Sequence, residues 1–344
     1  MCVKGEPLWG AYVAVQHGKI PANFALCQEK FVALHQLKAF SSDQFVLPLP
    51  PGHRFPMQKY ELLRGRVATA MPDVQLLEPP AATDGQLALA HDPDWIQRFS
   101  AGRISQSEQR AIGFPWSSAM VERSRRSAGA TIAAARAAIK EGVAVNLAGG
   151  THHAHAHRGE GFCCFNDVAV AARLMQAENR AQRVAIVDLD VHQGNGTASI
   201  FASDSSVFTL SLHGAANWPF VKACSDLDVG LPDGTSDRSY LQALEGALEQ
   251  MFARFVPDLI LYIAGADVLG GDRLGRLALT PAGIALRDRM VFDCALGRGL
   301  PLAVAMGGGY CREIERTVAV HAKTISLAAQ LQPSWAAACD LERR

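Results

Sequence analysis

The sequence predicts a single α/β domain in which a doubly wound, mainly parallel central sheet is flanked by helices. Short and nearly continuous apolar runs alternate with longer segments of helical periodicity from about residue 40 onward. Strands that are apolar on both sides are typical of parallel sheets that lie between two layers of helices. With 344 residues, of which 49% are apolar, the chain is long enough to bury such a core.

The predicted strands are β-rich apolar runs, and the predicted helices are segments in which apolar residues recur every three or four positions. In chain order, the strands are 44–49, 143–149, 183–190, 207–214, 258–267 and 301–310. The helices are 118–141, 166–178, 236–255, 281–296 and 311–330.

The sequence shows no boundary that would divide it into several domains. No internal repeat and no Gly/Ser or Pro linker separates these elements, so we expect one domain over residues 37–344. Residues 1–36 fit neither periodicity. We interpret them as an N-terminal extension, either a docked helix or a poorly ordered segment.

The composition excludes several functional classes. Thirty-three basic and thirty-three acidic side chains cancel, which leaves no net basic charge for a nucleic acid partner. The eight cysteines form no C-x-x-C pair and indicate reduced thiols in a cytoplasmic protein. No apolar run reaches the length of a membrane span, so we expect no membrane partner.

Polar side chains follow four of the predicted strands at their carboxyl ends. In open parallel sheets, ligands bind beyond this edge, because the loops converge there. We therefore expect one shared site. Its residues are His152 and His153 after strand 143–149, Asp188, Asp190 and His192 at the end of 183–190, Asp267 after 258–265, and Tyr310 after 301–306.

The segment "DLDVHQGNG" indicates a metal site. A spacing of two residues on an extended chain places Asp188, Asp190 and His192 on one side. Asp267 would complete an Asp₂His set with an open coordination position, which suits a catalytic divalent ion. The alternative is an acidic loop that caps a helix starting near Gly194.

The segment "GGTHHAHAH" at 149–157 contains four of the eleven histidines. Histidine carries protons near neutral pH, so His152 and His153 could supply a proton shuttle and an electrostatic helper, with Asp188 and Asn195 as partners. We expect His155 and His157 to be loop residues that touch no metal. A zinc site built from the four histidines alone is the weaker rival interpretation.

Tyr310 follows three glycines, where the backbone must turn tightly. Its phenol is a candidate oxyanion donor for a tetrahedral intermediate. The alternative is a tyrosine that only packs at the end of a strand.

Together these residues resemble the histone deacetylase family, within the arginase/deacetylase fold. The resemblance covers roughly residues 38–330 and rests on four segments: "GGTHHAHAHRGEGFCCFNDVAVA", "VDLDVHQGNGTASIF", "AGADVLGGDRLGRLALTPAGI" and "GGGY". The segments "HQGNG", "GDRLG" and "LPLPPGHRFPMQKYELLR" are most similar in sequence to class IV and its bacterial relatives.

The resemblance implies specific roles for the site residues. Zn²⁺, or alternatively Fe²⁺, would be bound by Asp190, His192 and Asp267. His153 would act as general base and then acid, with His152 beside it, held by Asp188. Tyr310 would hydrogen-bond the amide carbonyl. The residues implied to line a substrate tunnel are Phe162, Trp218, Gly161 and Leu274, and those implied to bind a structural K⁺ are Asp188, Ser211 and Leu212.

Two departures from the family pattern bear on function. Asn195 is neutral where many members have a carboxylate, so the pKa of His153 should be lower and the free base favoured at neutral pH. The loop "GFPWSS" at 113–118 lacks the Asp with which many deacetylases anchor a substrate backbone, which bears against peptide-type recognition.

We therefore predict a zinc-dependent amidohydrolase, a deacylase that acts on N-ε-acyl-lysine-type amides. An acylpolyamine or other small-amide deacylase is the alternative substrate class. A non-catalytic protein that binds acyl-lysine is the alternative of another class. A binuclear manganese hydrolase resembling arginase would need more carboxylates than "DLDVHQGNG" and Asp267 provide.

Overall fold

The structure is a computed structural model that describes residues 36–342. The extension predicted over residues 1–36 lies outside the described residues, apart from its last position. Within the described residues, an eight-stranded sheet has the order β2-β1-β3-β8-β7-β4-β5-β6, and every neighbouring pair is parallel. The strands are β1 Lys38–Phe40, β2 Gln75–Leu77, β3 Val143–Asn146, β4 Val184–Asp188, β5 Val207–Gly214, β6 Leu227–Leu231, β7 Leu259–Ile263 and β8 Leu302–Ala305.

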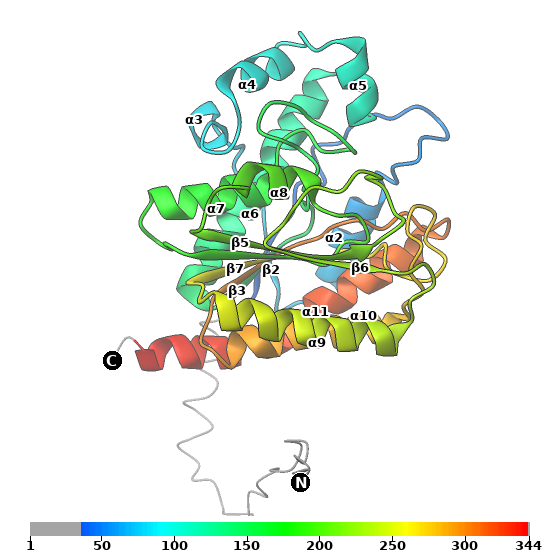
Figure 1. The fold of residues 1–344 in the computed structure, drawn as a ribbon. Coiled ribbons are helices and arrows are strands. Elements are labelled where there is room, and N and C mark those ends of the chain that lie inside the picture. The colour runs from blue at the N-terminus through cyan, green and yellow to red at the C-terminus, as the bar shows by residue number, and fades with distance from the viewer. Residues whose placement is uncertain (1–35, 343–344) are drawn as a thin grey trace, which may run out of the picture. The chain divides into compact units, whose positions relative to one another are not determined.

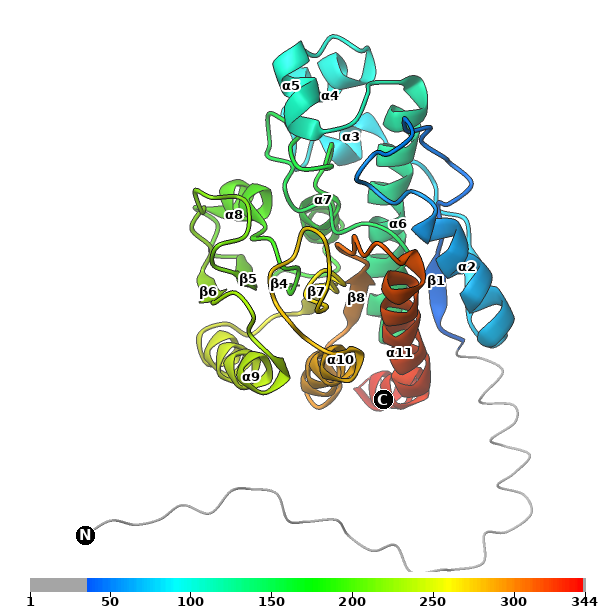
Figure 2. The ribbon, with the colours of Figure 1, turned by 90° about the vertical axis from the view of Figure 1, so that its right-hand side faces the viewer.

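Helices cover both faces of this sheet, which confirms the predicted fold class (Figure 1). Helices α2, α9, α10 and α11 lie on one face, and α6 and α7 lie on the other (Figure 2). The helices are α2 Lys59–Ala70, α3 Asp84–Leu87, α4 Pro93–Ser100, α5 Gln106–Ile112, α6 Ser118–Glu141, α7 Asp167–Ala177, α8 Asn195–Phe201, α9 Asp237–Arg254, α10 Pro281–Leu296 and α11 Ile314–Glu342.

The core consists of two apolar layers separated by the sheet. Along a strand, successive side chains point to opposite faces, so Val145 and Val187 join one layer while Ala144 and Ile186 join the other. All residues of β3, β4, β5, β7 and β8 are buried. No helix among the described residues has the length and apolar character that crossing a membrane requires.

One predicted strand is wrong. Residues 44–49 form an irregular loop, and the strand of this region is β1 at Lys38–Phe40. Pro48, Pro50 and Pro51 lack the N–H donors that a strand inside a sheet needs. The short strands β2 and β6 and the helices α2, α3, α4, α5 and α8 were also absent from the prediction.

Candidate active site

The four strands that carry the predicted site residues are consecutive in the sheet, in the order β3-β8-β7-β4. Their carboxyl ends therefore form one continuous edge. His152 and His153 follow β3, Tyr310 follows β8, Asp267 follows β7, and Asp190 and His192 follow β4. All six are buried.

Asp190, His192 and Asp267 meet at this edge. His192 Nδ1 lies 3.0 Å from Asp190 Oδ1 and 3.2 Å from Asp267 Oδ2. One ligand atom from each residue lies within 4.8 Å of the others. In the part of the chain that the structure describes, this is the one buried His and carboxylate group with such spacing, and it includes neither His155 nor His157.

The chemistry of these three side chains fits a divalent cation. Two carboxylates and an imidazole are enclosed together, and two buried negative charges are costly unless a cation compensates them. Asp267 Oδ2 is buried and accepts no hydrogen bond. Asp267 Oδ1, in contrast, accepts from the main-chain N–H of Val191 at 3.0 Å, which orients the carboxylate. A cation would satisfy the oxygen that remains.

The two histidines each contact a different polar partner. His152 Nδ1 donates to Asp188 Oδ2 at 2.6 Å, and His153 Nδ1 donates to Asn195 Oδ1 at 2.8 Å. The two imidazole rings lie 4.0 Å apart between centroids. With its Nδ1 proton engaged by Asn195, neutral His153 keeps the lone pair of Nε2 available as a base.

The environment separates the pKa values of this pair. Burial lowers the pKa of His152, but the Asp188 and Asp190 carboxylates outweigh it and raise that pKa to about 9. Burial, followed by the nearby His152 and His192, lowers the pKa of His153 well below its usual value. Burial is the main cause of this lowered pKa, and the hydrogen bond to Asn195 acts in the opposite direction, so the effect expected from a neutral residue at position 195 stays a prediction.

His155 contacts Asn195, the polar partner of His153. Asn195 Nδ2 donates to His155 Nε2 at 3.3 Å, and His155 is itself buried. His157 is exposed and pairs with Arg158. His155 therefore helps to orient the amide of Asn195, whereas His157 is a surface residue of the same loop.

Asp167 holds the loop that carries the histidine pair. Its carboxylate accepts from the main-chain N–H groups of Gly150 and Thr151 at 3.1 and 2.7 Å. It also accepts from the Thr131 hydroxyl at 2.5 Å, which ties the loop to helix α6. This carboxylate therefore fixes the backbone just before His152.

The turn before Tyr310 is packed against the candidate metal-ligand group, which consists of Asp190, His192 and Asp267. Gly308 has φ +49°, and a Cβ there would come within 2.2 Å of the Asp267 carboxylate, so only glycine fits. Buried Lys59 donates from Nζ to the carbonyl oxygens of Gly308 and Gly309. Asp272 Oδ2 accepts from the Tyr310 N–H at 2.6 Å.

The Tyr310 ring faces the metal-ligand group, with its centroid 6.5 Å from that of His192. Burial, with the Asp267 and Asp190 carboxylates, raises the pKa of the Tyr310 phenol well above its usual value. The hydroxyl therefore stays protonated and can donate a hydrogen bond.

The predicted tunnel residues line one open cavity of about 890 Å³ above the histidines. They are Gly161, Phe162, Trp218 and Leu274. The Trp218 ring packs edge-on against His153, with 4.6 Å between centroids. Phe162 has φ 66°, a left-handed conformation that is unfavourable for a bulky residue, and it directs an aromatic ring to the wall of this cavity.

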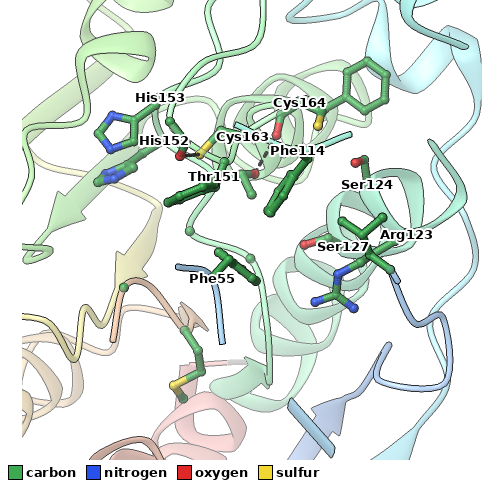
Figure 3. A pocket seen from close by; sticks show the side chains of 18 of the residues that line it. Phe55, Phe114, Arg123, Ser124, Ser127, Thr151, His152, His153, Cys163 and Cys164 are labelled. Atoms are coloured by element: carbon green, nitrogen blue, oxygen red, sulfur yellow. Dashed lines mark hydrogen bonds between the residues drawn. The ribbon is translucent and has the colours of Figure 1, made fainter. Parts of the chain in front are cut away.

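A smaller enclosed cavity of about 70 Å³ continues inward from the histidines. Figure 3 shows His152 and His153 on one side of it, and Arg123, Ser124 and Ser127 of helix α6 on the other. Lys59 also lines it. The inner cavity therefore combines cationic and hydroxyl side chains with aromatic ones such as Phe55 and Phe114.

Arg287 of helix α10 joins the strands that supply the carboxylates. It is fully buried, and its Nη1 donates to the carbonyl oxygens of Leu189 and Gly265 at 3.2 and 2.6 Å. Asp288 compensates its charge at 2.7 Å. The guanidinium therefore bridges the ends of β4 and β7 beside Asp190 and Asp267.

The residues predicted to bind K⁺ are neighbours across β4 and β5. Asp188 is opposite Ser211 in the parallel register, and Leu212 follows. The Ser211 hydroxyl lies 2.9 Å from His213 Nδ1. Asp188 Oδ1 accepts from the Asp190 N–H at 3.1 Å, so this carboxylate already contacts both the metal-ligand segment and His152.

A buried trio of metal-ligand type, a histidine pair and a protonated phenol lie together on a parallel α/β sheet, an arrangement typical of a metal-dependent hydrolase. The family model for the histone deacetylase domain matches residues 53–325. The chain belongs to the histone deacetylase family.

Similar proteins agree with this assignment. The chain is 45% identical over 280 residues to an uncharacterized protein of Picosynechococcus sp., a match that covers 80% of this chain and 93% of that protein. It is 34% identical over 261 residues to histone deacetylase 2 of Arabidopsis thaliana, covering 73% of this chain and 67% of that protein. The crystal structure of a histone deacetylase homologue complexed with SAHA superposes with a TM-score of 0.72 at 26% identity, covering 85% of this chain and 84% of that one.

Proposed function

We propose that this protein is a zinc-dependent deacylase that hydrolyses the amide of N-ε-acyl-lysine-type substrates. The observation that carries the proposal is the buried Asp190, His192 and Asp267 trio, with the His153–Asn195 pair and Tyr310 beside it. Retention of all these groups favours catalysis over simple acyl-lysine binding. Asp188, Ser211 and Leu212 are proposed to bind a structural K⁺.

In the proposed hydrolysis, the ion and the side chains would perform different steps. When bound by Asp190, His192 and Asp267, Zn²⁺ or Fe²⁺ would polarise the substrate carbonyl and lower the pKa of water. His153 Nε2 takes the proton from the attacking water and later donates it to the departing amine. The Tyr310 hydroxyl donates to the oxygen that becomes negative in the tetrahedral intermediate.

The substrate enters through the aromatic-walled cavity. Phe162 and Trp218 provide apolar walls for the methylene chain of a lysine, and the acyl group then lies toward the enclosed inner cavity. His152, with its raised pKa, places a positive charge beside His153 and keeps the pKa of that base low.

The direct test is an activity screen of purified, metal-quantified protein on lysine peptides with acyl chains of increasing length. We expect hydrolysis of acyl-lysine, loss of activity after chelation, and recovery when Zn²⁺ is added back, because the three ligands leave a coordination position open. Full activity in protein shown by metal analysis to be metal-free would contradict the proposal.

The pH profile tests the role of Asn195. In the wild type, the free base of His153 persists below neutral pH, because its pKa is lowered, and activity is lost only as pH falls through that pKa. The Asn195→Asp substitution places a carboxylate at 2.8 Å from Nδ1 and should raise this pKa. The acidic limb of kcat/KM is expected to move to higher pH by about one unit or more.

Asn179→Asp is the matched control for this profile, because it adds the same charge at an exposed loop position away from the site. Its acidic limb should match the wild type. An unchanged limb in the Asn195→Asp variant would show that another group controls the profile.

A further inference from the structure

The mouth of the substrate cavity carries positive charge without compensation. Arg54, in the loop before α2, and Arg110, in the last turn of α5, both line the mouth and are exposed. Neither guanidinium has a hydrogen bond or ion pair within the described part of the chain. Two free guanidinium groups therefore face an approaching substrate.

The carboxylate that lines the mouth already has partners within the chain. Among the described residues that line it, Glu160 is the one carboxylate, and its Oε2 lies 3.3 Å from Arg158 Nε and 3.6 Å from His155 Nε2. The neighbouring Arg273 is a further cationic side chain. Its guanidinium donates hydrogen bonds to the carbonyl oxygens of Tyr310 and Arg54. The local field at the entrance is consequently positive, although the chain as a whole has no net charge.

The mouth also has apolar side chains. Phe220 lines the cavity and is 77% exposed, and the adjacent Val221 is 88% exposed. Leu274 contributes a further apolar side chain and no charge. An extended peptide that enters beside Arg54 and Arg110 can therefore rest on an apolar surface as well.

We propose that this arginine mouth, defined as Arg54 and Arg110, selects acyl-lysine in proteins whose flanking residues are acidic. The inference rests on the deacylase function proposed above and names its substrate class. Guanidinium groups bind carboxylates with charge-assisted, often bidentate hydrogen bonds. An acylated polyamine carries further ammonium groups and a basic peptide carries lysines and arginines, and the mouth repels both.

The test compares three capped tripeptides in which N-ε-acetyl-lysine lies between glutamates, alanines or arginines, together with acetylated spermidine. At low salt, we expect kcat/KM to fall in the order glutamate, alanine, arginine, with about 2- to 10-fold between the extremes, as exposed ion pairs are weak. The difference should shrink at about 0.5 M NaCl, because salt screens exposed charges.

Matched variants assign the effect to these residues. The double variant Arg54→Gln, Arg110→Gln should lose most of the preference. Arg238→Gln removes the same charge from an exposed residue of α9 that does not line the mouth, and it should keep the preference. An unaltered preference in the double variant, or faster turnover of the arginine peptide or acetylated spermidine by the wild type, would overturn the inference.

Equilibrium binding of the same peptides separates this inference from the proposed function. Hydrolysis of all three peptides at equal rates with equal Kd values would contradict the arginine mouth and leave the deacylase function standing. Tighter binding of the glutamate peptide without hydrolysis of any substrate would support the arginine mouth and contradict the deacylase function. Absence of both would overturn both.

Discussion

The His153→Gln variant is expected to lose about 100- to 10 000-fold in turnover, the range that a positioned general acid-base supplies. Glutamine keeps a polar side chain of similar reach but cannot accept and return a proton near neutral pH. Because His153 donates from Nδ1 to Asn195 and packs against Trp218, both of its proton-transfer roles depend on the single remaining nitrogen. The measurement is kcat on an acyl-lysine peptide with the bound metal quantified.

His157→Gln is the control for this loss, because His157 lies on the same loop but is exposed. It should retain activity close to that of the wild type. If His153→Gln kept wild-type turnover with metal bound, the proton would have to be transferred by another residue, and His152 would be the next to test.

The Tyr310→Phe variant is expected to lower kcat by about 100- to 1000-fold, as removal of one oxyanion donor does in other hydrolases. The phenol of Tyr310 is buried and stays protonated, so its contribution is a hydrogen bond to the oxygen that gains charge. Since that bond strengthens in the transition state, kcat should fall more than KM rises.

Tyr240→Phe removes a buried phenol hydroxyl on helix α9 that interacts with Arg287 and does not line the substrate cavity. Its activity should remain close to that of the wild type, which separates the loss of a catalytic donor from the loss of any tyrosine hydroxyl. Equal activity of Tyr310→Phe and Tyr240→Phe would refute an oxyanion role for Tyr310.

Much of the fold could be predicted because its main elements have strong local patterns. Helices α6 and α10 have the predicted bounds, and β5 matches 207–214. These segments are long or fully buried, so apolar periodicity alone identifies them. Three-residue strands such as β1 and β2 are too short to show a period. The apolar run 44–49 resembles a strand, but Pro48 within it and Pro50 and Pro51 just after it lack the N–H donors of a strand inside a sheet.

The predicted site residues were found because they sit at strand ends, where a parallel sheet brings them to one edge. The positions of Asp190, His192 and Asp267 at the ends of strands predicted that the three share one site, and the structure brings them together. Their catalytic roles remain predictions that the experiments above test. The order of the four central strands does not follow from the local sequence, since it depends on contacts between distant segments.

The supporting residues could not be predicted, because nothing in their local sequence marks them. Lys59 contacts a carbonyl 249 positions away in the chain, and Arg287 contacts one 98 positions away. Asp272 and Asp167 look like ordinary loop or helix-start residues in the sequence. In the sequence, Lys59 and Arg287 look like ordinary charged residues of a helix, and only the structure shows that both are buried.

Arg287 has a consequence for how the proposed ion would be acquired. A cationic side chain inside the molecule already cross-links the two backbone segments from which the carboxylates project. The proposed ion site would thus be formed by the polypeptide itself, unlike small zinc domains in which the metal drives folding. If the three residues bind an ion as proposed, the ion could then be loaded and exchanged on an already folded chain.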